Sequence, residues 1–372
     1  MNPRRLALPC SLVVLISVLG FFQSLRAQAP AGKAVSKEAM LRAVVRDVIL
    51  PGYRDLNAKC QLMTNAFGDF SKHPDADSLQ KARQTWLEAL LAARRVQWIQ
   101  SGPVADREFL ASFYYSRITP PRIEGAVQSA QPINGAYIEE IGPSARGMFA
   151  LEYLLFGRKT FPPSDSKAAT ATLLAGFSQP TANRRQQLLL TFAQDLEIKS
   201  ALLVNDWSAS GSGSAAGKFI SGGQQTLNVL VNDLARFVEQ VEEQRVHFIL
   251  VLPNPIARQM DRIENSSSDS SHKNVVALIE GVETLFHGKD TDSLQSYLAK
   301  INPSLISVLN TRLDASLAAA RAIKAPLEEQ VQTDRKPVET TYDKLHELEL
   351  FCKVDLASSL GVTITFNSND GD

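Results

Sequence analysis

The segment SARGMFALEYLLFG, residues 144–157, places one carboxylate and one guanidinium in an otherwise apolar run. Burial of the Glu152 carboxylate is costly unless it is paired or hydrogen-bonded. One interpretation is a structural ion pair with Arg146, or with an arginine of another helix such as Arg94. A second is a pocket where Glu152 binds a metal ion or a polar ligand. General-base catalysis is the third, although no activating metal ligand is visible beside Glu152.

Two further groups of side chains could contribute to a site. Trp86 and Trp98 are twelve residues apart, which separates them by about 120° around a helix, so they either pack in the core or line a pocket. Asn367, Asp370 and Asp372 end the chain and carry the hard oxygen atoms that calcium or iron accepts. The alternative for this tail is a frayed terminus.

The histidines give no recognisable catalytic pattern. They are scattered as His73, His247, His272, His287 and His346. His346 and Glu349 are three apart and could share a helix face, which we interpret as a surface or packing pair. The sequence has no HExxH, no GxSxG, no phosphate-binding loop and no CxxC, so it carries no standard signature of a metalloprotease, a serine hydrolase, a P-loop enzyme or a thiol oxidoreductase.

Composition and the first residues indicate an exported globular protein. The 372 residues are 44% hydrophobic, and 39 basic residues balance 39 acidic ones, so nothing favours nucleic-acid binding. Arg4 and Arg5 precede the apolar run 6–22, which predicts a signal peptide, residues 1–27, cleaved after Ala27. A retained membrane anchor is the alternative. In an oxidising envelope the two remaining cysteines could pair, and the sequence leaves that open.

Apolar residues recur at helical spacing through most of the chain, and alternating strand patterns are nearly absent. We therefore predict an all-α fold of two antiparallel bundles, at about 36–207 and 218–372, joined by the Gly/Ser-rich segment 208–217. The longer helices are expected at 41–67 with a proline kink at Pro51, and at 79–93, 181–207, 227–241, 273–287, 303–324 and 326–360.

Several segments resemble one known family. They are TWLEALLAARRVQWIQSGPV at 85–104, RGMFALEYLLFG at 146–157, HKNVVALIEGVETLFHG at 272–288 and LGVTITFNSNDGD at 360–372. In this order they are similar to landmarks of the imelysin family, which includes peptidase homologues and iron-regulated envelope proteins. The resemblance implies a helical domain over 28–372 with rough internal pseudo-symmetry, a location in the periplasm or cell envelope, and a link to iron uptake.

The family's GxHxxE motif corresponds here to Gly147, Phe149 and Glu152. Phe149 replaces the histidine and cannot bind a metal, so we expect a non-catalytic protein that binds a metal ion or small ligand. The alternatives are a metallopeptidase with a degenerate motif and a structural or protein-interaction module. The ion would be iron, zinc or calcium. Partners would be an envelope iron-transport component and, peripherally, a membrane. The predicted ligand-binding residues are Arg146, Glu152, Trp86, Arg94 and Asn367, and the predicted metal ligands are Glu152, Asp370 and Asp372.

Overall fold

A computed structural model describes residues 35–159, 166–178, 182–253, 256–289 and 291–365. They belong to one compact unit, Val35–Asp372. Every regular element within these ranges is helical and none is a strand, which confirms the predicted all-α class. Among the described helices, none combines the length and the apolar character needed to cross a membrane. The predicted signal peptide lies outside the described residues.

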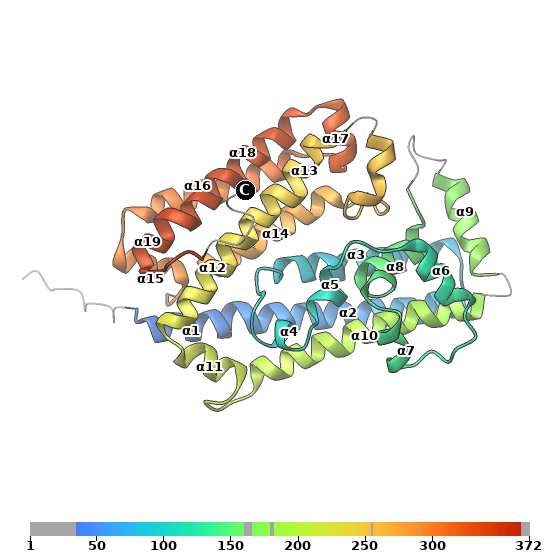
Figure 1. Cartoon of the computed structure of the whole chain (residues 1–372), viewed down its shortest axis with the longest axis horizontal. Coiled ribbons are helices and arrows are strands. Elements are labelled where there is room, and N and C mark those ends of the chain that lie inside the picture. The colour runs from blue at the N-terminus through green and yellow to red at the C-terminus, as the bar shows by residue number, and fades with distance from the viewer. Residues whose placement is uncertain (1–34, 160–165, 179–181, 254–255, 290, 366–372) are drawn as a thin grey trace, which may run out of the picture. The chain divides into compact units, whose positions relative to one another are not determined.

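The first part of the chain forms long helices separated by short ones (Figure 1). These are α1 (Lys37–Ala43), η1 (Val44–Ile49), α2 (Leu50–Lys72), α3 (Ala76–Arg95), α4 (Pro103–Asp106), α5 (Leu110–Tyr114), α6 (Pro120–Gln128), α7 (Gly135–Glu140), η2 (Pro143–Ala145), α8 (Gly147–Phe156), α9 (Ser166–Gly176) and α10 (Ala182–Ser208). Helix α2 packs between α3 and α10, and α8 packs against α3, α5 and α10.

The second part repeats this use of long antiparallel helices. It consists of α11 (Ala215–Ser221), α12 (Gln224–Val241), η3 (Glu242–His247), α13 (Phe248–Val251), η4 (Ile256–Arg262), α14 (Ser271–His287), α15 (Leu294–Ile301), α16 (Leu305–Ala322), α17 (Leu327–Thr333), α18 (Lys336–Leu350), η5 (Phe351–Leu356) and α19 (Ala357–Leu360). Helix α18 packs on α16 and α12, and α14 packs on α16.

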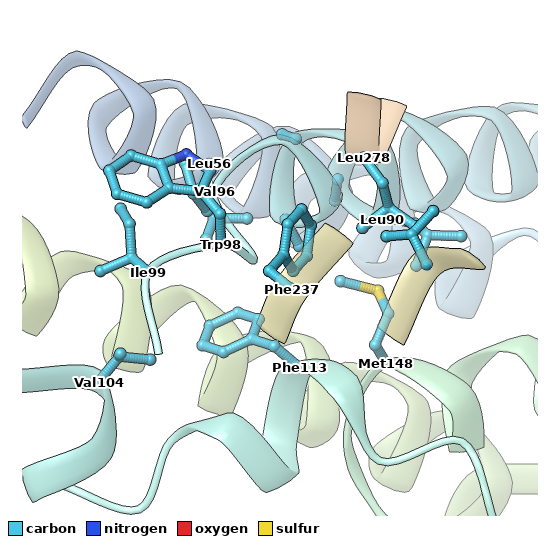
Figure 2. Close-up of a cluster of buried hydrophobic side chains, with 14 of the residues drawn as sticks. Leu56, Leu90, Val96, Trp98, Ile99, Val104, Phe113, Met148, Phe237 and Leu278 are labelled. Atoms are coloured by element: carbon cyan, nitrogen blue, oxygen red, sulfur yellow. The ribbon is translucent and has the colours of Figure 1, made fainter. Parts of the chain in front are cut away.

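Helix α14 joins the two groups, because it packs against α3 as well as α16. The approach is close at Gly281, where an added Cβ would lie 2.2 Å from the carbonyl oxygen of Arg95. Figure 2 shows the apolar core at this junction, where Phe237 of α12 and Leu278 of α14 converge on Leu90 and Met148. The division into two halves and their pseudo-symmetry stay predictions.

The structure differs from the expected helix boundaries at two prolines. The turn before Pro51 is the π-helical segment η1, and the helix continues through this proline, which lacks an N–H donor. The single helix expected over 326–360 is divided, because α17 ends at Thr333 and α18 begins with Pro337 in its first turn. The Gly/Ser-rich segment is shorter than expected, since α11 begins at Ala215.

Part of the C-terminal segment docks on α12. Asn232 donates to the carbonyl oxygen of Thr363 at 3.0 Å and accepts from the backbone N–H of Thr365 at 2.8 Å. Asn367, Asp370 and Asp372 lie outside the described residues, so their predicted role stays a prediction. The two cysteines that follow the predicted signal peptide, Cys60 and Cys352, are buried free thiols in this structure.

Candidate functional site

Glu152 lies on α8, and the start of this helix requires a glycine. Gly147 has φ +78°, and an added Cβ would lie 2.3 Å from the carbonyl oxygen of Ser112. Side chains rarely adopt that conformation, and none would fit against this backbone. Helix α8 is buried around most of its circumference, which explains why its sequence is apolar throughout. The helix therefore carries the Glu152 carboxylate into the interior.

The Glu152 carboxylate is held by neutral donors from a distant loop. It accepts hydrogen bonds from Asn265 Nδ2 at 2.8 Å, from the Ser268 N–H at 3.0 Å and from Ser268 Oγ at 2.8 Å. Glu152 is only 5% exposed. Burial raises the pKa of Glu152 to about 7, although these hydrogen bonds and the nearby Arg94 charge favour the ionised form. The carboxyl group can therefore change its protonation state near neutral pH.

Arg94 is completely buried beside Glu152. Its guanidinium donates to Glu264 Oε2 at 2.8 Å and to Gln97 Oε1 at 2.7 Å, and it lies over the ring of Phe149 at 5.3 Å from the centroid. Phe149, at the histidine position of the family motif, thus supports a buried cation through its π-face. Arg94 is a positioning residue for this part of the protein.

Glu264 is the counter-ion of two arginines, because Arg245 Nε lies 3.2 Å from the same oxygen that Arg94 contacts. Burial alone would raise the pKa of Glu264, but Arg245 and Arg94 hold it below its ordinary value. Glu264 is therefore ionised at neutral pH, and the Arg94 charge is compensated inside the protein.

Asn265 connects the two carboxylates. Its Nδ2 donates to Glu152, while its Oδ1 accepts from Asn274 and, at 3.4 Å, from Arg94. Asn265 is 2% exposed and has φ +56°, a backbone conformation that asparagine adopts more readily than most residues. Its amide orientation is fixed by these partners, so the loop is held to α8 and α3 in one arrangement.

The predicted ion pair between Glu152 and Arg146 is wrong. Within the described part of the chain, Arg146 pairs instead with Glu139, to which its Nη1 donates at 2.5 Å. Glu139 also lies 3.4 Å from Lys199 Nζ, so Arg146 belongs to a network with Lys199. Arg94 lies near enough to Glu152 to influence its pKa, but its hydrogen bonds to described residues go to Glu264, Gln97 and Asn265.

Trp86 has the packing role that the sequence offered as one of two alternatives. It is fully buried, its Nε1 donates to the carbonyl oxygen of Met148 at 2.9 Å, and its ring meets Phe156 edge-on at 5.3 Å. Through these contacts with Met148 and Phe156, Trp86 packs α3 against α8. Trp98, which is 2% exposed, lines a separate cavity of about 390 Å³ together with Trp207 and Phe219.

A cavity of about 170 Å³ opens beside Glu152. Its wall is formed by the segment before α6, by α8, by residues 158–159 and by residues 260–267, and it includes Ser116, Thr119, Phe149, Glu152, Asn265 and Ser267. This volume is below that of most drug-sized sites and suits a small metabolite. Hydroxyl and amide groups dominate the polar part of the wall.

Sequence reasoning missed Lys159, which also lines this cavity. Its Nζ lies 2.5 Å from Asp269, 3.1 Å from the buried Glu328 and 2.8 Å from Glu329. Although burial lowers the pKa of Lys159, these three acids raise it overall. Nothing local in the sequence signals this cluster, because its members come from three distant segments.

The residues at Glu152 do not fit the metal site that the family motif implies. The position of the histidine is occupied by Phe149, and the Glu152 carboxylate already accepts three hydrogen bonds. Arg94 adds a buried positive charge next to it. A cation would need to displace these donors, and Phe149 would offer it no further ligand. The arrangement instead suits hydrogen bonding to a small polar molecule.

Comparison with known proteins agrees with this architecture. The family model described as Imelysin matches residues 49–350, and among curated proteins none matches the chain. The fold resembles a Parabacteroides distasonis protein assigned as an iron-regulated protein A precursor, with TM-score 0.69 and 17% identity, covering 87% of this chain and 93% of that one. An imelysin-like protein from Psychrobacter arcticum gives TM-score 0.64 and 18% identity, covering 89% and 97%. The chain therefore belongs to the imelysin family.

Proposed function

We propose that this protein is a non-catalytic binding protein of the cell envelope that takes a small polar ligand into the cavity beside Glu152, in connection with iron uptake. One observation carries the proposal: a buried carboxylate with a pKa near neutrality forms part of the wall of a small cavity. Perturbed carboxylates in cavities are typical of functional sites.

The charges around the cavity define the class of ligand. Glu264 is paired with Arg94 and Arg245, and Lys159 is paired with three acids, so these charges have partners of opposite sign within the protein. Uncharged groups such as Ser116, Thr119 and Ser267 line the cavity beside the charged Arg158. A small molecule rich in hydroxyl, amide or carboxyl groups satisfies them better than a bare metal ion.

The non-catalytic role rests on Phe149 and on the hydrogen bonds of Glu152. A metallopeptidase needs an open metal coordination position and a base near the bound water. Phe149 offers no metal ligand, and Glu152 is engaged by Asn265 and Ser268. These features favour binding over hydrolysis.

The proposed location and partners rest on the predicted signal peptide and on the similarity to a protein assigned as iron-regulated. In this proposal the protein is exported, cleaved after Ala27, and works in the periplasm or at the cell envelope with an iron-transport component. The intact mass of the protein from an envelope fraction tests the cleavage. A mass that includes residues 1–27 would contradict it.

The binding proposal is tested with tag-free protein and a panel of amino acids, sugars and hydroxycarboxylates such as citrate. We expect one chemical group of the panel to raise the melting temperature of the wild type and to lose this effect in Glu152→Gln. Glu139→Gln is the matched control, because Glu139 pairs with Arg146 and does not line the cavity.

Three results would contradict the proposal. The first is a wild type that no member of the panel stabilises and that carries no bound molecule in native mass spectrometry. The second is equal stabilisation of the wild type and Glu152→Gln, which would favour a purely structural role for Glu152. The third is chelator-sensitive cleavage of casein, which would favour the metallopeptidase alternative.

A further inference from the structure

A second group of chemically active side chains lies between η3 and α18. Glu242 is the first residue of η3, and His346 and Glu349 share one face of α18. His346 Nδ1 lies 2.8 Å from Glu242 Oε1 and 3.7 Å from Glu349 Oε2. One ligand atom from each of the three residues lies within 4.8 Å of the others. The sequence identified the His346 and Glu349 pair but gave no indication of its third member.

Both carboxylates are buried, at 2% exposure for Glu242 and 6% for Glu349. Two adjacent buried carboxylates repel each other unless positive charge lies between them. Lys353 Nζ supplies one charge to Glu349 at 2.7 Å. Among the described residues the ion-pair partner of Glu242 is His346, whose ring nitrogen can also bind a metal. A cation bound between the two carboxylates would reduce their mutual repulsion.

The backbone at this place is unusual in both elements. The π-helical turn η3 begins at Glu242, and a second π-helical turn, η5, begins two residues after Glu349. Such turns are rare, cost stability and occur often at functional sites, because the additional residue redirects side chains. Here they accompany the two carboxylates that the cluster brings together.

A cavity of about 550 Å³ adjoins the cluster, and Glu242, His346 and Glu349 form part of its wall. His346 is half exposed. Water can therefore reach the ligand atoms and complete a coordination shell around an ion. The cluster at Glu242 also lies on different elements from the cavity at Glu152, so the two sites can be tested separately.

We propose that Glu242, His346 and Glu349 bind one divalent transition-metal ion, with water in the remaining positions. An imidazole nitrogen with two carboxylates suits zinc, iron(II) or manganese better than calcium or magnesium, which prefer oxygen alone. Ligand atoms at about 2.1 Å from one ion lie within about 4.2 Å of each other. The half-exposed His346 side chain supplies the small movement that closes the site to this size.

The ion replaces the proton between His346 and Glu242. A metal ion binds the deprotonated carboxylate and the neutral imidazole, so it takes the place of the proton in the hydrogen bond between them. Lys353, Arg236 and the acids Glu239 and Glu243 also face this region and set its net charge.

The test is calorimetric titration of tag-free protein with Zn²⁺, and with Co²⁺ as a spectroscopic probe of nitrogen and oxygen ligation. We expect one equivalent to bind to the wild type, and Glu242→Gln and His346→Ala each to weaken binding at least about tenfold. His247→Ala is the matched control, because His247 lies on η3 and pairs with Glu243 outside the ligand set. Glu152→Gln should bind the metal as the wild type does.

The proposal is overturned if the wild type shows no saturable binding, or if both ligand variants bind as tightly as the wild type. It is also overturned if removal of residues 366–372 abolishes binding while Glu242→Gln retains it, which would place the metal on Asp370 and Asp372. Circular dichroism establishes that each variant is folded. A metal-induced rise in melting temperature that persists in Glu242→Gln would count equally against the proposal.

Discussion

Burial raises the pKa of both Glu152 and Glu242 to about 7, but the partners of the two carboxylates differ. Neutral donors from Asn265 and Ser268 surround Glu152, whereas Glu242 faces the carboxylate of Glu349 and the imidazole of His346. Hydrogen bonds from neutral donors hold Glu152, whereas Glu242 shares His346 with a second buried carboxylate. Burial alone therefore does not distinguish a binding residue from a metal ligand, and the partners of the carboxylate decide between them.

The largest expected effect comes from the cation behind Glu152. Arg94→Leu would leave Glu264 with only Arg245 and remove a donor from Asn265 and Gln97. Losing one partner of a buried ion pair costs about 3–5 kcal/mol, so the unfolding free energy in urea should fall by that amount. The adjacent Arg95→Leu is the control, because its exposed ion pair with Glu280 is worth about 0–1 kcal/mol. Equal losses in both variants would contradict the central role of Arg94.

Glu152→Met is next. It keeps the volume of the side chain but leaves Asn265 Nδ2 and both donors of Ser268 without their acceptor. Unsatisfied buried donors cost about 1–3 kcal/mol. We expect a net loss of about 2 kcal/mol at pH 6, measured by urea denaturation. A variant as stable as the wild type would show that these hydrogen bonds do not hold the loop.

The pH dependence of stability separates the two sites. A carboxyl group whose folded pKa is raised from 4.5 to about 7 binds more protons when folded than when unfolded between these values. Its contribution is complete below pH 4.5 and is lost as the pH rises to 7, by up to about 1.4 kcal/mol per pH unit. In Glu152→Met the unfolding free energy should therefore fall less steeply between pH 4.5 and pH 7 than in the wild type, because the contribution of Glu152 is absent.

The same measurement of stability against pH can be repeated with bound metal. Saturating Zn²⁺ should remove the part of the pH dependence of the unfolding free energy that comes from Glu242, because the bound ion keeps that carboxylate ionised in the folded protein. The part that comes from Glu152 should remain. If Zn²⁺ leaves the slope of the wild type unchanged, the metal does not bind at Glu242.

The sequence was sufficient for the fold because helical spacing extends over most of the chain. It also located Glu152, whose apolar neighbours made a buried carboxylate conspicuous. It could not give the partners, since Asn265 and Ser268 are more than one hundred positions away in an ordinary polar loop. The contact between Glu242 and His346 also joins residues more than one hundred positions apart. The predicted Arg146 pairing failed because Glu139, from the preceding helix α7, takes the guanidinium.

The smallest expected effect has the opposite sign. Glu242→Met removes one of two adjacent carboxylates, and water can take its place beside the half-exposed His346. Because replacing a buried charge by an apolar group is often neutral or stabilising, the variant should be more stable than the wild type at pH 8, by less than about 1 kcal/mol. Glu243→Met, at the exposed neighbouring position, is the control. A loss comparable to that of Glu152→Met, in metal-free protein, would show that Glu242 is a structural residue satisfied by its present partners.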